Sequence, residues 1–296
     1  MVVSATDGRV TVKPRHGKRT RLTKTATAIP VGSTVDATRG KVLLVTAKGR
    51  YTTQHGTFSQ GAFVVTQERS GLTDLTLTGG SFAPCTAARA AGAQVHGAAN
   101  TRRKLFGTAH GRFQTRGRNS SASVRGTTWL TEDRCNGTVI ENKSPSPSSK
   151  VDTQSRNLTF NLDPGQTITY YCNHLSIQPD TYCVMLLAYP DQGIVAGGII
   201  TQVDVNTYRF CVQAPDGQFG CTDPLPLAAK DANGFHQGVF ACPVRQVGSF
   251  EFGWSLDGQN LLFPTLSLTL NVEGPNEHCQ TIPTTDQPIA KGLPQR

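Results

Sequence analysis

Residues 111–130 read GRFQTRGRNSSASVRGTTWL and contain two extended segments. In the first, Phe113 and Thr115 alternate with polar residues, as they do in a half-buried strand. The same alternation places three arginines together on the other strand face: Arg112, Arg116 and Arg118. In the second segment, residues 122–130, the apolar positions again fall on one face. The stretch therefore predicts antiparallel β-structure.

The period-2 pattern continues in both directions along the chain. Short apolar or alternating runs occur at 41–46, 63–66, 75–77, 158–162, 168–172, 208–212, 250–254 and 266–272. Turn sequences follow at 215–217 and 256–258, and 30 glycines and 17 prolines among 296 residues suit a turn-rich chain. No apolar run approaches the roughly 18 residues of a membrane-spanning helix. The strand and turn signals predict an all-β protein of two antiparallel domains, the second a disulfide-bonded β-sandwich.

Charge and composition divide the chain near residue 150. Residues 1–150 hold 23 Lys and Arg against 7 Asp and Glu, a net charge of +16, whereas residues 151–296 carry −7. The Ser-Pro run NKSPSPSSK at 142–150 favours extended backbone, as a linker does. We predict a basic β domain (1–143), a Ser/Pro linker (144–156), an acidic β-sandwich (157–275) and a Pro-rich tail (276–296).

Eight cysteines, none in a C-x-x-C pair, predict structural disulfides rather than a metal site. The two cysteines before the linker suggest the pair Cys85–Cys135. After it, the cysteines that flank turns suggest Cys211–Cys221 and Cys172–Cys183, and the two that are left suggest Cys242–Cys279. Such bonds indicate an extracellular or cell-surface protein. The first ten residues lack a leader, so the export signal is expected to have been removed or to lie upstream.

The first 142 residues resemble a FecR-like β domain of secreted actinobacterial proteins. The resemblance rests on the segments 29–42, 53–67, 103–107, 111–118 and 122–138, the last containing Val124-Arg-Gly-Thr127. It implies a non-enzymatic all-β module that acts through protein contacts and supplies no catalytic residues. The chain departs from that family after the turn at 136–138, where residues 139–142 run straight into the linker, so the closing strand is expected to be lost or supplied from elsewhere.

The basic half suggests an anionic partner, such as a wall polymer, or a protein partner. The candidate contact residues are Lys13, Arg15, Lys18, Arg19, Arg21, Lys24, Arg112, Arg116 and Arg118. A plainer interpretation makes the block at 13–24 a solvated hairpin, and pairs the three later arginines with Glu132 and Asp133. Nucleic acid is a weaker alternative, because no aromatic residues interleave with the block.

Nothing in the sequence identifies a cofactor, a metal site or catalytic residues. Seven histidines are scattered, and the G-x-S-x-G nucleophile motif is missing. Tyr170, Tyr208 and Trp254 fall on apolar strand faces and are expected in the core, whereas Tyr171, Tyr182 and Tyr189 are candidates for stacking on sugars. The main hypothesis is a non-catalytic secreted or surface binding module. The alternatives are a carbohydrate-binding accessory protein, a hydrolase with its site in the second domain, and a nucleic-acid binder.

Overall fold

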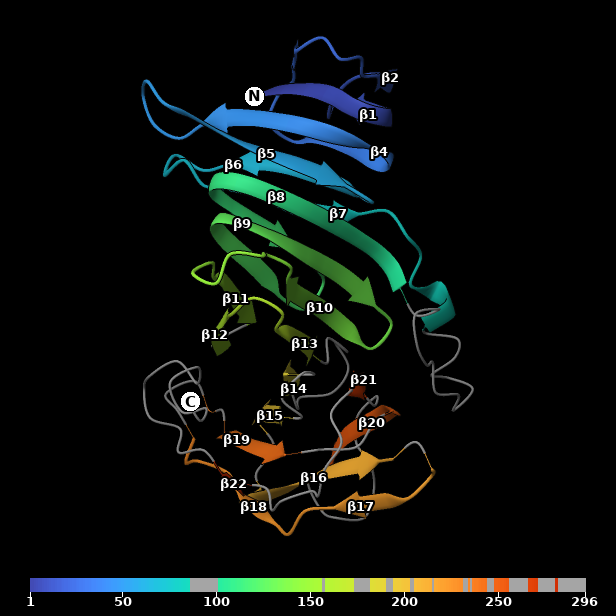
Figure 1. Cartoon of the computed structure of the whole chain (residues 1–296), viewed down its shortest axis with the longest axis vertical. Coiled ribbons are helices and arrows are strands. Elements are labelled where there is room, and N and C mark those ends of the chain that lie inside the picture. The colour runs from blue at the N-terminus through green and yellow to red at the C-terminus, as the bar shows by residue number, and fades with distance from the viewer. Residues whose placement is uncertain are drawn as a thin grey trace. The chain divides into compact units, whose positions relative to one another are not determined.

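The computed structural model is nearly all β (Figure 1), which confirms the predicted fold class. It describes residues 1–85, 101–155, 158–172, 182–189, 194–202, 205–214, 216–230, 234, 236–243, 248–255, 266–270 and 280–281. The chain divides into two compact units, the first formed by Met1–Pro84 and Thr101–Gly165 and the second by the remaining residues.

The described residues of the first unit form twelve strands, four of them between 12 and 16 residues long. They are β1 (Val2–Lys13), β2 (Thr20–Arg21), β3 (Thr27–Ala28), β4 (Ser33–Ala47), β5 (Thr53–Ser59), β6 (Ala62–Gln67), β7 (Thr73–Thr78), β8 (Thr101–Arg116), β9 (Ser121–Arg134), β10 (Gly137–Asn142), β11 (Val151–Ser155) and β12 (Leu158–Leu162). Figure 1 shows β1, β4, β5, β8 and β9 lying side by side.

The long strands bend and take part in two layers. Residues 33–36 of β4 pair with β6, whereas residues 41–47 pair with β5. Similarly, β8 pairs first with β5 and then, after a register shift at 110–113, runs parallel to β7. At the bend of β1 and β4, Gly8 lies opposite Gly40, and a Cβ on Gly8 would stand 2.4 Å from the Arg39 carbonyl oxygen. Glycine is therefore required where these two backbones approach each other.

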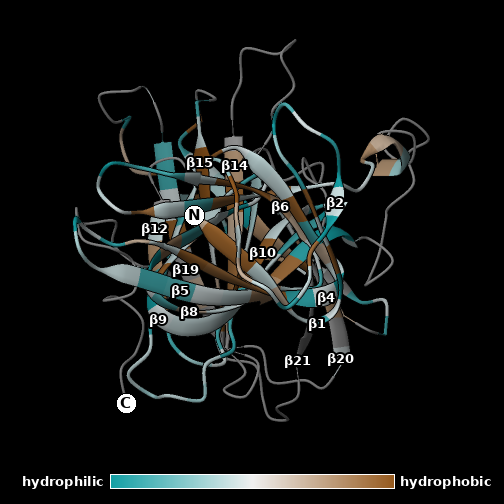
Figure 2. Ribbon diagram, turned by 90° about the horizontal axis from the view of Figure 1, so that it is seen from above, coloured by the Kyte–Doolittle hydropathy of each residue, from teal (hydrophilic) through white to brown (hydrophobic). Residues whose placement is uncertain are grey.

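The space between the two layers is filled by apolar side chains. Phe58 on β5 packs against Phe63, Phe113 and Trp129, with ring centroids 5.6, 5.7 and 6.1 Å away. The indole Nε1 of Trp129 donates to Thr115 Oγ1 at 2.9 Å, so the one polar atom of this ring is satisfied inside the core. Hydrophilic residues lie around β2, on the outside of the unit (Figure 2).

The boundary predicted between the domains is wrong in its second half. Residues 151–155 are not linker but strand β11, which pairs with residues 121–124 of β9. β12 then pairs with β11, and the first unit continues to Gly165. The segment before it also differs from the expectation, because residues 137–142 form a complete strand, β10, along β9.

The described strands of the second unit form two antiparallel sheets. One follows the order β13 (Thr167–Cys172), β14 (Tyr182–Tyr189), β15 (Ile194–Thr201), β19 (His236–Pro243) and β22 (Gln280–Thr281). The other joins β17 (Phe219–Cys221), β16 (Thr207–Gln213), β20 (Gly248–Ser255) and β21 (Leu266–Leu270), with β18 (Leu225–Pro226) also on β16. One hydrophobic cluster includes residues of both sheets, among them Val184, Ile199, Phe210, Phe252 and Trp254. Of the predicted tail, only β22 is described.

Candidate functional site: an arginine hollow on the first unit

The predicted basic block forms an exposed connection at the start of the first unit. β1 ends at Lys13, and β2 runs back along it with Thr20 opposite Val12. All six of its Lys and Arg residues are exposed, as the hairpin interpretation expects. Arg19 returns to the sheet, where its Nη1 donates to Thr11 Oγ1 at 3.1 Å and to Asp36 Oδ2 at 3.3 Å.

Two further arginines meet Arg19 in a shallow hollow beside the β1–β4 bend. Arg9 on β1 and Arg39 on β4 are exposed and directly opposite each other in the antiparallel register. Like charges in such a cross-strand pair repel each other. The hollow, of about 380 Å³, is lined by Arg9, Thr11, Arg19, Asp36, Thr38 and Arg39, so three guanidinium groups share one carboxylate. Its excess positive charge and its hydroxyl groups suit an anionic group such as phosphate, sulfate or carboxylate.

Arg112, Arg116 and Arg118 are all exposed, but Arg118 lies beyond the predicted strand, because β8 ends at Arg116. The partners of these side chains also differ from the predicted Glu132 and Asp133. Arg116 instead pairs with Asp74 at 2.8 Å, and the guanidinium group of Arg118 lies over the ring of Phe82. Arg112 Nη1 donates to the Ser70 carbonyl at 2.7 Å. The predicted partners have other ion pairs, Glu132 with Arg134 and Asp133 with Arg103.

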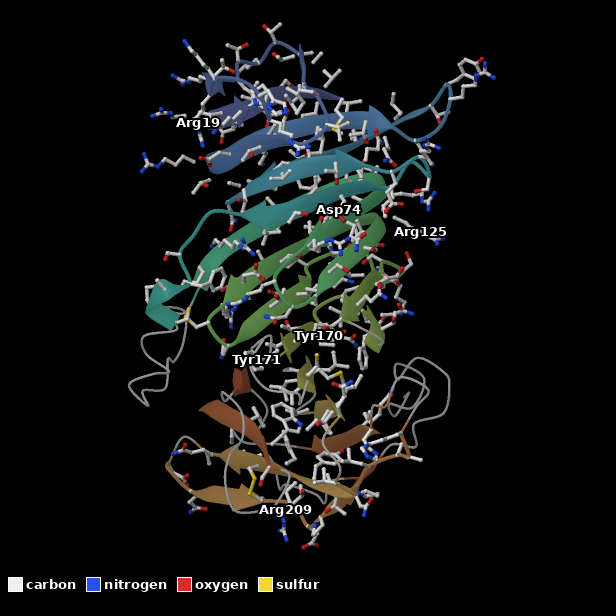
Figure 3. All side chains as sticks on the ribbon, turned by 180° about the vertical axis from the view of Figure 1, so that it is seen from behind. Arg19, Asp74, Arg125, Tyr170, Tyr171 and Arg209 are labelled. Carbon is white, nitrogen blue, oxygen red and sulfur yellow. A yellow bond between two sulfur atoms is a disulfide. The ribbon has the colours of Figure 1, made fainter. Side chains whose placement is uncertain are left out.

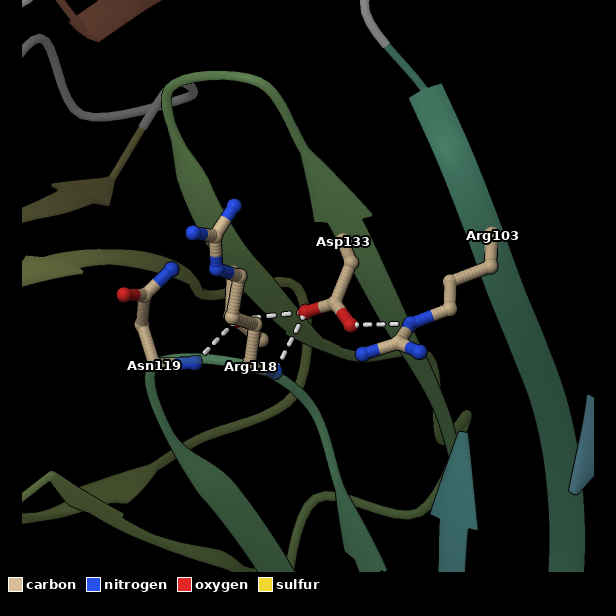
Figure 4. A network of polar contacts seen from close by, with 5 residues as sticks. Arg103, Arg118, Asn119 and Asp133 are labelled. Carbon is tan, nitrogen blue, oxygen red and sulfur yellow. Dashed lines mark hydrogen bonds and ion pairs between the residues drawn. The ribbon is translucent and has the colours of Figure 1, made fainter. Parts of the chain in front are cut away.

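Asp133 is the centre of a buried polar network (Figure 4). One of its oxygens accepts from Arg103 Nε at 2.6 Å. The other accepts from the Arg118 backbone N–H at 2.8 Å and from the Thr138 hydroxyl at 2.6 Å, while Thr138 Oγ1 accepts from the Asn119 N–H at 2.9 Å. The carboxylate thus fastens the β8–β9 turn to β9 and β10. Every oxygen serves a structural contact, which identifies Asp133 as a structural residue.

The neighbouring Glu132 is also held in its charged form. Burial favours the neutral acid, but hydrogen bonds from Arg134 and Thr101 and the positive charges of Arg134 and Lys104 outweigh it. The pKa of the Glu132 carboxyl consequently lies below its usual value of 4.5. This carboxylate therefore contributes stability to the folded unit.

One of the three tyrosines predicted to stack on sugars is a core residue. Tyr171 is only 7% exposed and belongs to the hydrophobic cluster of the second unit (Figure 3). Alternation fails here because residues 183–188 of the adjacent strand β14 are all buried, so both faces of this sheet are covered. Tyr170, Tyr208 and Trp254 are buried as predicted. The side chains of Tyr182 and Tyr189 lie outside the described residues.

The cysteines of the described part form disulfides. Cys211 and Cys221 are bonded across the β16–β17 hairpin, as the turn between them predicts. Cys85, Cys135 and Cys183 are also disulfide-bonded. The register places Cys172 directly opposite Cys183, as the predicted pair requires. The pairs Cys85–Cys135 and Cys172–Cys183 stay predictions. Cys242–Cys279 remains one too, since Cys279 and the Cys242 side chain lie outside the described residues.

Among the described residues, no group of three or more His, Cys, Asp and Glu side chains could hold a metal ion. His236 is buried in the second unit, where Nδ1 lies 2.7 Å from the Ala228 carbonyl oxygen. Within the same residues, no helix is long and apolar enough to cross a membrane.

The chain matches no family model, no curated protein and no solved structure.

Proposed function

We propose that this protein is a non-catalytic, secreted or cell-surface binding module with a FecR-like first unit. In this proposal, the first unit binds an anionic group of a wall polymer or of a protein partner in the hollow formed by Arg9, Arg19 and Arg39. The disulfides support an oxidising location. The arrangement of the three arginines is the observation that carries the proposal.

The acids of the first unit leave this hollow undercompensated. Five of the seven acids in residues 1–150 form ion pairs, and most of these pairs lie elsewhere in the unit. Only Asp36 faces the hollow, and its partner is Arg19. Arg9 and Arg39 therefore present their charge to solvent next to each other, and an anion between them would remove their mutual repulsion.

The experiment measures retention of the full chain on immobilised heparin and on wall teichoic acid at increasing salt. The double variant Arg9→Gln/Arg39→Gln should bind at least tenfold more weakly at low salt, because two charge-assisted contacts are lost. Lys143→Gln/Lys150→Gln is the matched control. It removes the same net charge from exposed residues paired with Glu141 and Asp163.

Retention of the control should change less than twofold. Equal losses in the two variants would show that binding follows total charge rather than the hollow, and would overturn the proposal. Turnover of an ester, glycoside or peptide substrate by the purified chain would overturn its non-catalytic part.

A further inference from the structure

Four segments far apart in the sequence meet along one edge of the first unit. They are the β4–β5 turn (48–52), the β6–β7 turn (68–72), the crossing of β8 between the layers (111–112) and that of β9 (125–126), here called the hairpin edge. Arg112 Nη1 donates to the Ser70 carbonyl, and Gly126 lies opposite His110 in the register. In Figure 3, Arg125 lies on the same side of this unit as the β4–β5 hairpin, away from Arg19.

The hairpin edge is strongly basic. It exposes five cationic side chains, Lys48, Arg50, Arg69, Arg112 and Arg125, against the single acid Glu68. Nearby, the Arg15 side chain packs beside Gly32, whose N–H donates to the Val65 carbonyl near the end of β6. This positive charge belongs to a different surface from the hollow at the β1–β4 bend.

The same edge carries the exposed apolar side chains. Among the described residues, the large exposed hydrophobic side chains are Tyr51 (86%), Val31 (56%) and Val2 (37%). Tyr51 is at the tip of the β4–β5 turn, Val31 is next to Gly32 beside β6, and Val2 lies opposite Val45, close to the same turn. The guanidinium group of Arg50 lies over the Tyr51 ring at 5.4 Å.

Buried contacts fix the geometry of this edge. Gln54, only 2% exposed, donates from Nε2 to the Gly71 carbonyl at 2.7 Å and accepts at Oε1 from the Arg112 N–H at 2.8 Å. Gln67 Nε2 donates to the Ala47 carbonyl at 2.5 Å. One amide side chain thus holds the β6–β7 turn and the β8 crossing in place, and a second ties β6 to the end of β4.

We propose that the hairpin edge docks on the surface of an anionic lipid bilayer. Basic side chains near such a surface are attracted by the acidic headgroups. A tyrosine at a protruding tip fits the interface, where its ring is buried and its hydroxyl stays hydrated. A soluble polyanion requires the cations alone, whereas a bilayer also accounts for the apolar side chains gathered on the same edge. This surface is separate from the hollow, so the inference does not depend on the proposed function.

The test is sedimentation of the full chain with vesicles of phosphatidylcholine, with and without about one third phosphatidylglycerol. Binding is expected only to the anionic vesicles. Each basic contact contributes about fivefold to affinity, so Lys48→Gln/Arg50→Gln/Arg69→Gln should weaken binding on the order of 100-fold. Arg9→Gln/Arg19→Gln/Arg39→Gln removes the same charge at the hollow and should change vesicle binding less than threefold. All six side chains are exposed, and the urea midpoint of each variant verifies its folding.

Tyr51→Ser provides the second readout. It keeps every charge and should lower vesicle affinity about tenfold through lost apolar burial. Equal losses in the two triple variants would overturn the proposal, because attraction would then follow net charge. It would also be overturned if Tyr51→Ser binds like the parent and soluble polyphosphate competes fully, since the edge would then be a polyanion site. Unchanged polymer retention in the hollow variants would count only against the proposed function.

Discussion

Replacement of Asp133 should destabilise the first unit more than any exposed charge change. In Asp133→Ala, the Arg103 guanidinium group, the Arg118 N–H and the Thr138 hydroxyl lose their acceptor. Breaking a buried ion pair costs about 3–5 kcal/mol. The Arg103 side chain is 21% exposed and also lies over Phe82, which gives its charge some compensation. We therefore expect a loss of about 4 kcal/mol in the free energy of unfolding, close to a 1,000-fold change in the unfolding equilibrium.

The assay is urea unfolding followed by tryptophan fluorescence. The chain has two tryptophans, one in each unit, so a Trp254→Phe background makes Trp129 the only reporter. With a slope of roughly 2 kcal/mol per molar urea, the loss should lower the midpoint by about 2 M. Asp133→Asn should lose less, about 2–3 kcal/mol, because its remaining oxygen can still accept from the Arg118 N–H and from Thr138.

A double variant tests the cause of this loss. Arg103→Met removes the guanidinium group that Asp133→Asn leaves without a carboxylate, so the combined variant should be more stable than the sum of the two single losses predicts. Additive losses, or a cost below 1 kcal/mol for Asp133→Ala, would refute the structural role assigned to this carboxylate.

Three further measurements test other parts of the fold. Gly71→Ala should lower the free energy of unfolding in urea by at least 1 kcal/mol more than Gly79→Ala. Both glycines have φ near 80°, but only a Cβ on Gly71 would meet a backbone carbonyl oxygen, at 2.6 Å. Equal losses in the two variants would contradict this steric explanation. The contribution of Glu132 to the free energy of unfolding should be fully present above pH 4.5 and be lost as the pH falls through its lowered pKa. Glu132→Gln should therefore flatten the decline of the free energy of unfolding below pH 4.5. Replacing Cys211 and Cys221 by serine should lower the free energy of unfolding by about 2–3 kcal/mol, seen as a lower Tm of the second unit; an unchanged Tm would show that this cross-link is dispensable.

Much of the strand content could be predicted from alternation, but the bends could not. Residues 158–162 and 250–254 alternate cleanly, and both are strands. By contrast, β8 contains Gly111 at a positive φ where it crosses between layers, and this break divides one strand into two apparent segments. β11 was missed because its buried positions, Val151, Thr153 and Ser155, are mostly polar and follow a Ser-Pro run.

The site was harder to predict because it depends on register. Arg9 and Arg39 are 30 residues apart, and neither belongs to a basic run. Only the pairing of β1 with β4, including its two shifts, brings them opposite each other. Net charge could therefore indicate an anionic partner, while the residues that would contact it required the fold.

The path of the chain explains how one basic unit can offer two separate binding surfaces. Each long strand crosses from one layer to the other at an edge, so turns and bends collect at two opposite edges while the apolar positions face inward. Residues at such turns and bends lie on the surface, so arginine and lysine can stand there without disturbing the packing of the core. The bend of β1 and β4 exposes Arg9 and Arg39, whereas the hairpin edge exposes Arg50 and Arg69 beside Tyr51. Because the rigid layers separate the two groups, charge removed at one edge should leave binding at the other intact, and the paired triple variants measure this independence directly.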